Sequence, residues 1–184
     1  DWSSDVCSSD LFDPTDIGHV VVGMATNGVV TTTDGGSSWT SASGLSQTGG
    51  ARNSFNGVVS AADPSVVWVE SIDIDESASG APSGGKHIYR SGDGGLSFTP
   101  VVDAGNGITL TNGAAMAADP NDRDLIYVPF GSTVFGKFLE LYRYDHGSGS
   151  LTLTTTTTIP QTKARSMVFA PQDPGRLVVG FEGS

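Results

Sequence analysis

The stretch Thr32-Thr33-Asp34-Gly35-Gly36-Ser37-Ser38-Trp39 decides the fold, because it recurs as Ser91-Gly92-Asp93-Gly94-Gly95-Leu96-Ser97-Phe98. Both copies follow the pattern hydroxyl-x-Asp-x-Gly-x-x-aromatic. An Asp side chain can accept hydrogen bonds from the backbone N–H groups just after it, and glycine adopts conformations that a Cβ disfavours. Alternating segments, residues 29–32 and 87–90, precede the two copies. The pattern therefore predicts two β-hairpin turns, each followed by an aromatic residue that begins the next strand and points into a core.

A second repeat is centred on an Asp-Pro-type turn. Residues 56–64 read Asn-Gly-Val-Val-Ser-Ala-Ala-Asp-Pro and match residues 112–120, Asn-Gly-Ala-Ala-Met-Ala-Ala-Asp-Pro. Residues 12–23 match residues 169–180 in the same way. The aligned prolines are Pro14, Pro64, Pro120 and Pro171, at spacings of 50, 56 and 51 residues. Such regular spacing indicates a repeated supersecondary unit.

Each repeated unit reads as four strands. A strand of small apolar residues comes first, and proline then ends it because proline cannot extend a central strand. A β-branched strand, a third strand, the Asp turn and a fourth strand follow. Four strands in roughly 40–50 residues predict an all-β fold, a β-propeller of four-stranded antiparallel blades. We expect repeats at approximately 12–54, 55–110, 111–162 and 163–184, which is about three to four blades. A third Asp turn is expected at Asp145, although no Ser or Thr stands two residues before it.

The repeated turn resembles the Asp box of the BNR-repeat β-propellers, a group that includes sialidases, xyloglucanase-type glycoside hydrolases and sortilin-type receptors. In those families the Asp box links the third and fourth strands of a blade, on the face opposite the usual ligand site. The resemblance therefore implies a structural role for both copies. The residues concerned are Thr32, Asp34, Gly36 and Trp39 in the first copy and Ser91, Asp93, Gly95 and Phe98 in the second.

The extent of the chain also yields expectations. A closed propeller needs about four to eight blades, so we expect the 184 residues to be a fragment of a longer protein. Residues 1–11, which include the single cysteine, have no repeat partner and resemble a non-native leader. We therefore expect the partial propeller to occupy residues 12–184. The leader lacks the features of a signal peptide, so secretion or a place in the cell envelope is implied by the family resemblance alone.

Composition narrows the classes of partner. The formal net charge is −11, which disfavours nucleic acid because phosphate binding needs clustered Lys and Arg. An excess of acidic residues usually reflects a surface exposed to water. No run approaches the roughly 18 apolar residues of a membrane span. His19, His87 and His146 are scattered without metal-ligand spacing, so the sequence predicts no cofactor.

The longest insertion carries the only candidates for catalysis. If the Asp-Pro turns and the Asp turns share one face, the opposite face carries the loops between second and third strands. One of these loops, residues 73–86, brings together Asp73, Asp75 and Glu76. Two carboxyl groups could serve glycoside hydrolysis, and the same oxygens could bind Ca²⁺. A solvated acidic loop is the commoner meaning of such a cluster.

Other candidates for ligand binding lie in equivalent positions of neighbouring units. Phe130 and Phe135 occupy the loop that matches 73–86 and could form a sugar-stacking platform, a packed loop or a partner contact. Asn56 and Asn112 precede the aligned prolines by eight residues, as does Lys163. They would line the channel entrance or satisfy turn backbone, which is the commoner role.

Two arginines complete the set of candidates. Arg52 and Arg165 stand in the connections between units, and a guanidinium group suits a carboxylate ligand. Their positions are not equivalent, and the Arg-Ile-Pro motif of sialidases is absent from this sequence. Sialidase activity is therefore not supported.

Two functions remain open. The first is a binding or accessory module for a polysaccharide or protein ligand, which we favour because every strong signal in the chain is structural. The alternative is a glycoside hydrolase of the xyloglucanase type, with Asp73 or Asp75 as its acid or base. The Asp box occurs in both classes of protein and does not separate them.

Overall fold

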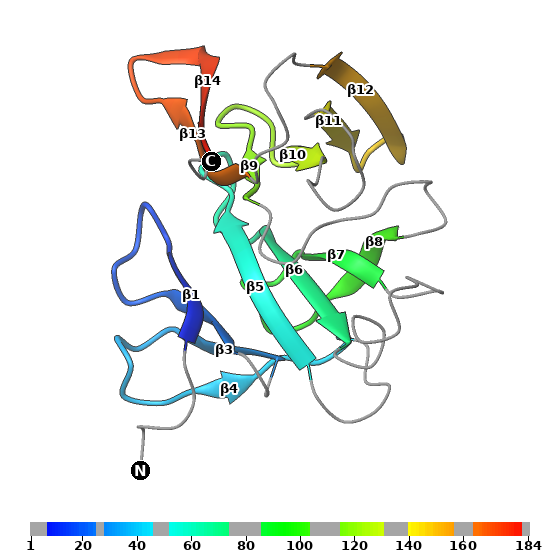
Figure 1. Cartoon of the computed structure of the whole chain (residues 1–184). Helices are drawn as coiled ribbons and strands as arrows, with labels where there is room; N and C mark the ends of the chain where they lie inside the picture. Colours follow the sequence, from blue (N-terminus) through cyan, green and yellow to red (C-terminus); the bar gives the residue numbers. More distant parts are fainter. Residues whose placement is uncertain are drawn as a thin grey trace.

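The computed structural model describes residues 7–24, 28–45, 52–73, 86–103, 115–130, 140–156 and 164–181. Within these ranges the chain contains strands and turns but no helix, which confirms the prediction of an all-β fold. The strands form three four-stranded sheets and one two-stranded sheet. Figure 1 shows the sheets following one another in the order of the chain.

Every sheet is an antiparallel meander in which consecutive strands pair. The first sheet contains β1 (Cys7–Phe12), β2 (Val20–Met24), β3 (Gly28–Thr32) and β4 (Thr40–Ser41). The second contains β5 (Arg52–Val59), β6 (Val67–Asp73), β7 (Lys86–Ser91) and β8 (Thr99–Asp103). The third contains β9 (Ala117–Ala118), β10 (Leu125–Phe130), β11 (Glu140–Asp145) and β12 (Ser150–Thr156). The last contains β13 (Ala164–Ala170) and β14 (Asp173–Phe181). We refer to these sheets as blades one to four.

The first blade begins earlier than the sequence predicts. Residues 7–11, which we expected to lie outside the fold, form β1 with Phe12 and pair with β2 in the register Asp10↔Val22 and Leu11↔Val21. Leu11 is 9% exposed and belongs to the core. These residues therefore take part in the sheet, and blade one has four strands. That residues 1–11 are non-native stays a prediction.

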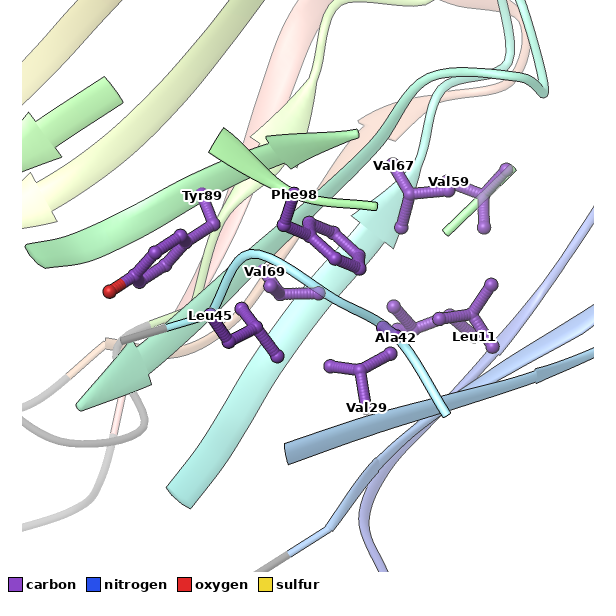
Figure 2. Packing of buried hydrophobic residues seen from close by; sticks show 10 residues of the cluster. Leu11, Val29, Ala42, Leu45, Val59, Val67, Val69, Tyr89 and Phe98 are labelled. Atoms are coloured by element: carbon purple, nitrogen blue, oxygen red, sulfur yellow. The ribbon is translucent and has the colours of Figure 1, made fainter. Parts of the chain in front are cut away.

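Among the described residues, the core lies in two clusters between neighbouring blades. The cluster between blades one and two contains Leu11, Val21, Val29, Ala42, Leu45, Val59, Val67, Val69, Tyr89 and Phe98 (Figure 2). The cluster between blades two and three contains Val66, Trp68, Ile88, Val102, Met116, Ile126, Val128 and Tyr144.

Strand β6 shows why the sequence contains an unbroken apolar run at residues 66–69. Successive side chains of a strand point to opposite faces, so Val67 and Val69 face blade one while Trp68 faces blade three. A strand covered on both faces has no polar side, which explains the unbroken apolar run 66–69.

The aromatic residues after the two Asp turns differ in burial. Phe98 is 3% exposed and packs between blades one and two, as predicted. The same prediction was wrong for Trp39, which is 39% exposed. The physical reason is that blade one packs over Phe98, whereas no sheet among the described residues covers Trp39.

This difference predicts unequal costs for the same truncation at equivalent positions. Phe98→Ala should lower the free energy of unfolding by about 3–5 kcal/mol, because it leaves a cavity between two blades. Trp39→Ala should cost about 1 kcal/mol, since much of its ring is in water already. Urea unfolding of both variants measures the two losses, and equal losses would contradict the assignment of Phe98 alone to the core.

Candidate functional site

The first Asp turn is closed by a chain of short hydrogen bonds. The Thr32 hydroxyl donates to Asp34 Oδ1 at 2.7 Å and accepts the Gly36 N–H at 3.0 Å. Asp34 Oδ1 also accepts the Ser38 N–H at 2.9 Å, and Oδ2 accepts the Ser38 hydroxyl at 2.6 Å. The hydroxyl and the carboxylate together satisfy backbone donors on both sides of the turn.

The second Asp turn repeats these bonds. The Ser91 hydroxyl donates to Asp93 Oδ1 at 2.7 Å and accepts the Gly95 N–H at 2.9 Å. The backbone N–H and the hydroxyl of Ser97 donate to the two oxygens of Asp93. Sequence reasoning missed Ser38 and Ser97, although the serine recurs two residues after the glycine in both copies. This recurrence was the signal that would have identified them.

Both carboxylates are held in the ionised form. Hydrogen bonds from the hydroxyl and backbone of Ser38, and from Thr32, lower the pKa of Asp34 to about 2. Burial opposes ionisation of Asp93, but hydrogen bonds from Ser97 and Ser91 outweigh burial and lower its pKa. Carboxylates that are ionised and committed to backbone donors are poor proton donors at neutral pH, so the geometry fits a structural role.

The turns require glycine at matching positions. Gly36 and Gly95 both have φ of 90°, a left-handed conformation in which a Cβ is strained. A Cβ on Gly95 would also lie 2.8 Å from Thr31 Oγ1 in the neighbouring blade. The corresponding Cβ on Gly36 would meet no atom closer than 3.7 Å.

The third Asp turn is a different structure. Arg143 occupies the position of the hydroxyl residue, so the hydroxyl-to-carboxylate bond is missing. Asp145 Oδ1 still accepts the Ser148 N–H at 3.1 Å. The left-handed glycine is Gly149, with φ of 66°. This turn therefore keeps the carboxylate-to-backbone bond and forms the rest of the loop differently.

Each Asp turn is tied to the Asp-Pro-type turn of its own blade. The bonds run from Gly35 N to Gly18 O (3.0 Å), from Gly94 N to Ser65 O (2.8 Å) and from His146 N to Asp124 O (2.8 Å). The two kinds of turn therefore lie on one rim of the blades, which we call the turn rim. The loops after β6 and β10 leave the strands at the other end, which we call the loop rim.

Charged side chains on the turn rim join one blade to the next. Arg90 Nη2 of blade two donates to Asp124 Oδ1 of blade three at 2.6 Å, and Arg123 of blade three pairs with Asp63 of blade two. The Arg90 guanidinium also lies 5.4 Å from the centre of the Trp68 ring, a cation–π contact. Sequence reasoning missed these pairs because their members are 34 and 60 residues apart.

Four of the described candidates from the sequence lie at strand ends on the loop rim. The backbones of Arg52 and Asp73 pair directly at the ends of β5 and β6. Phe130 ends β10 and Arg165 lies near the start of β13. Asp75, Glu76, Asn112, Phe135 and Lys163 lie outside the described residues.

Two polar residues of the strands form hydrogen bonds to neighbours in the sequence. Asn56 is half-buried and its Oδ1 accepts the Gly57 N–H at 2.9 Å, a contact with adjacent backbone. Sequence reasoning missed Glu140, which pairs in register with Phe130 and accepts the Tyr142 hydroxyl at 2.8 Å. Burial and this bond to Glu140 raise the pKa of Tyr142. Glu70, missed as well, is a fully buried carboxyl group in β6.

Two kinds of feature are absent from the described residues. Within the seven described ranges, no three His, Cys, Asp or Glu side chains gather closely enough to hold a metal ion. The same part of the chain contains no helix that is long and apolar enough to cross a membrane.

No protein-family model matches the chain. It is similar to the dispase autolysis-inducing protein of Streptomyces mobaraensis, with 41% identity over 107 residues. The match covers 58% of this chain and 29% of that protein, so the chain aligns with less than a third of its curated relative.

Solved structures resemble the whole arrangement of blades. The GH74 enzyme of Niastella koreensis matches with a TM-score of 0.62 and 19% identity, over 91% of this chain and 27% of that chain. The GH74 xyloglucanase of Xanthomonas campestris matches with a TM-score of 0.59 and 16% identity, over 94% and 26%. YCF48 bound to D1 peptide matches with a TM-score of 0.52 and 17% identity, over 96% and 46%. The fold is a β-propeller. At these identities the likeness shows the fold alone.

The two left-handed glycines predict a matched pair of stability effects. Gly36→Ala should cost about 1–2 kcal/mol of unfolding free energy, the cost of the left-handed conformation. Gly95→Ala should cost about 1–3 kcal/mol more, because its Cβ also collides with Thr31 of blade one. Urea unfolding of the two variants gives the difference directly. Equal costs would show that blades one and two do not meet at Gly95 as described.

Proposed function

We propose that the chain is part of a propeller that binds a protein or glycan ligand on its loop rim, as a binding or accessory module. The observation that carries the proposal is the division of polar groups between the two rims. On the turn rim, the carboxylates of both hydroxyl-Asp turns are used in closing those turns. The ion pairs of Asp63 and Asp124 join neighbouring blades there. The loops between second and third strands begin at the loop rim, and function on a repeat scaffold is usually found in such loops.

The hydrogen-bonded Asp turns support a second part of the proposal. We infer that they are Asp boxes of the BNR type, since both copies share the hydroxyl, Asp, Gly and second-serine bonds. In that family such turns are structural and lie away from the ligand. Secretion, or a place in the cell envelope, belongs to the same proposal.

The names of the relatives support a protein ligand. The Streptomyces relative is named for inducing the autolysis of dispase, and YCF48 was solved with a peptide bound. The alternative, a xyloglucanase-type hydrolase, is supported by the GH74 neighbours and by the position of Asp73 at the loop rim.

One experiment separates the two functions. The purified chain is incubated with dispase and, separately, with xyloglucan, and binding, dispase autolysis and release of reducing sugar are measured. The binding proposal predicts association without sugar release, weakened several-fold by Arg52→Ala or Phe130→Ala on the loop rim. Ser37→Ala on the turn rim is the matched control and should bind normally.

The outcomes that contradict the proposal are equally specific. Hydrolysis of xyloglucan that Asp75→Asn abolishes would establish the alternative. The proposal would also be contradicted if Ser37→Ala weakened association and the loop-rim variants left it unchanged. The ligand would then bind the turn rim.

A further inference from the structure

A buried histidine joins blade one to blade two. His19 lies in the turn between β1 and β2 and is 8% exposed. Its Nδ1 lies 3.0 Å from Asp13 Oδ2 in the same turn. Its Nε2 lies 2.9 Å from the backbone carbonyl oxygen of Gly94, in the Asp turn of blade two. The imidazole therefore bridges two blades through both of its nitrogen atoms.

Both partners of the ring are hydrogen-bond acceptors. A backbone carbonyl oxygen can only accept. Asp13 is also an acceptor: burial opposes its ionisation, but hydrogen bonds from His19 and Thr15 outweigh burial and lower its pKa to about 2. Its other oxygen, Oδ1, already accepts the N–H groups of Thr15 and Asp16 and the Thr15 hydroxyl.

Two acceptors require two donors on the ring. A neutral imidazole has one N–H and one lone pair, whereas the imidazolium ion has an N–H on both nitrogens. In the neutral form the carboxylate would keep the proton on Nδ1, because charged acceptors form the stronger bond. The lone pair of Nε2 would then face the oxygen of Gly94 at the same short distance.

We propose that protonation of His19 acts as a latch between blades one and two. We call the contact between two neighbouring blades a joint. The imidazolium form donates from Nε2 to the Gly94 carbonyl oxygen and so stabilises the joint between blades one and two. Loss of the proton from Nε2 removes that bond, so the Asp turn of blade two loses its contact with the Asp-Pro turn of blade one, while the Thr31 hydroxyl still donates to Gly95 O at 3.0 Å. The joint is therefore tighter in acid and looser in base, and this inference is independent of the ligand on the loop rim.

Two other carboxylates in the turns that meet at His19 have hydrogen-bond donors of their own. On its own turn, Asp16 is the other carboxylate, and its Oδ1 accepts the Gly18 N–H. On the facing turn, Asp93 is bonded to Ser91 and Ser97. Asp13 is thus the carboxylate that bonds the ring, and the second contact is to a neutral carbonyl.

The joint between blades two and three also contains a histidine, His146, but there the neutral form is favoured. His146 packs against Trp68 with ring centres 6.1 Å apart, and Arg90, Asp124 and Asp145 are its charged neighbours. Burial and the charge of Arg90 lower the pKa of His146, so its contribution to stability is lost as the pH falls. The two joints should therefore respond to pH in opposite directions.

Hydrogen exchange tests the latch at two backbone bonds that cross the same joint. The Ser43 N–H donates to Leu96 O and the Phe98 N–H donates to Ser43 O. The Ser60 N–H, which bonds Val66 O within blade two, is the internal control. Protection factors, corrected for intrinsic exchange, are compared at about pH 5 and about pH 8.5.

The expected result is a loss of protection at Ser43 and Phe98 of roughly ten-fold or more at the higher pH, the effect of one charge-assisted bond. Ser60 should change less. In His19→Gln, whose side chain does not titrate, protection at Ser43 and Phe98 should be the same at both pH values. Equal protection in the wild type at both pH values would overturn the proposal.

A second measurement on the wild-type chain needs no variant. Ring ¹⁵N chemical shifts of His19 report which nitrogens carry a proton. The latch predicts protons on both nitrogens at about pH 5 and on Nδ1 alone at about pH 8.5. A single neutral tautomer at the lower pH, with Ser43 and Phe98 still protected, would overturn the latch.

Discussion

The hydrogen bond from a Ser or Thr hydroxyl to the carboxylate two residues later is the interaction on which the Asp turns of blades one and two depend. In both complete copies the same hydroxyl oxygen accepts the N–H of a left-handed glycine. The neighbouring glycine then donates to the Asp-Pro-type turn. One local contact thus connects the loop between third and fourth strands to the turn between first and second strands.

The turn rim also provides the contacts between blades. His19 bonds Gly94, Arg90 pairs with Asp124 and Arg123 pairs with Asp63, each across one joint. Below these contacts, the clusters that contain Trp68 and Phe98 fill the space between sheets. On the turn rim, most of the polar groups described above already bond other parts of the blades, so few remain to bind a ligand. The loops of the loop rim make none of these contacts between blades, so their sequence can change without weakening the contacts. This division underlies the proposed binding function.

Much of the fold follows from the sequence because its signals are local. The Asp turns, the Asp-Pro turns and the apolar run 66–69 each specify a piece of backbone within a few residues. Strand β1 was missed because residues 7–11 have no repeat partner and Leu11 alone among them is a described core residue. The joints were missed because Arg90 and Asp124 meet only after two blades have packed. For the site, the sequence indicated the loop rim, but not that Arg52 and Asp73 stand opposite each other in the backbone register of β5 and β6.

The most direct test of this account is a double-mutant cycle on Ser91 and Asp93, with unfolding free energies measured in urea for the wild type, Ser91→Ala, Asp93→Asn and the double variant. If the hydroxyl and the carboxylate close the turn together, either single change breaks the same structure. The account then predicts a coupling energy of about 1 kcal/mol or more. Additive losses, with coupling within about 0.3 kcal/mol of zero, would contradict it.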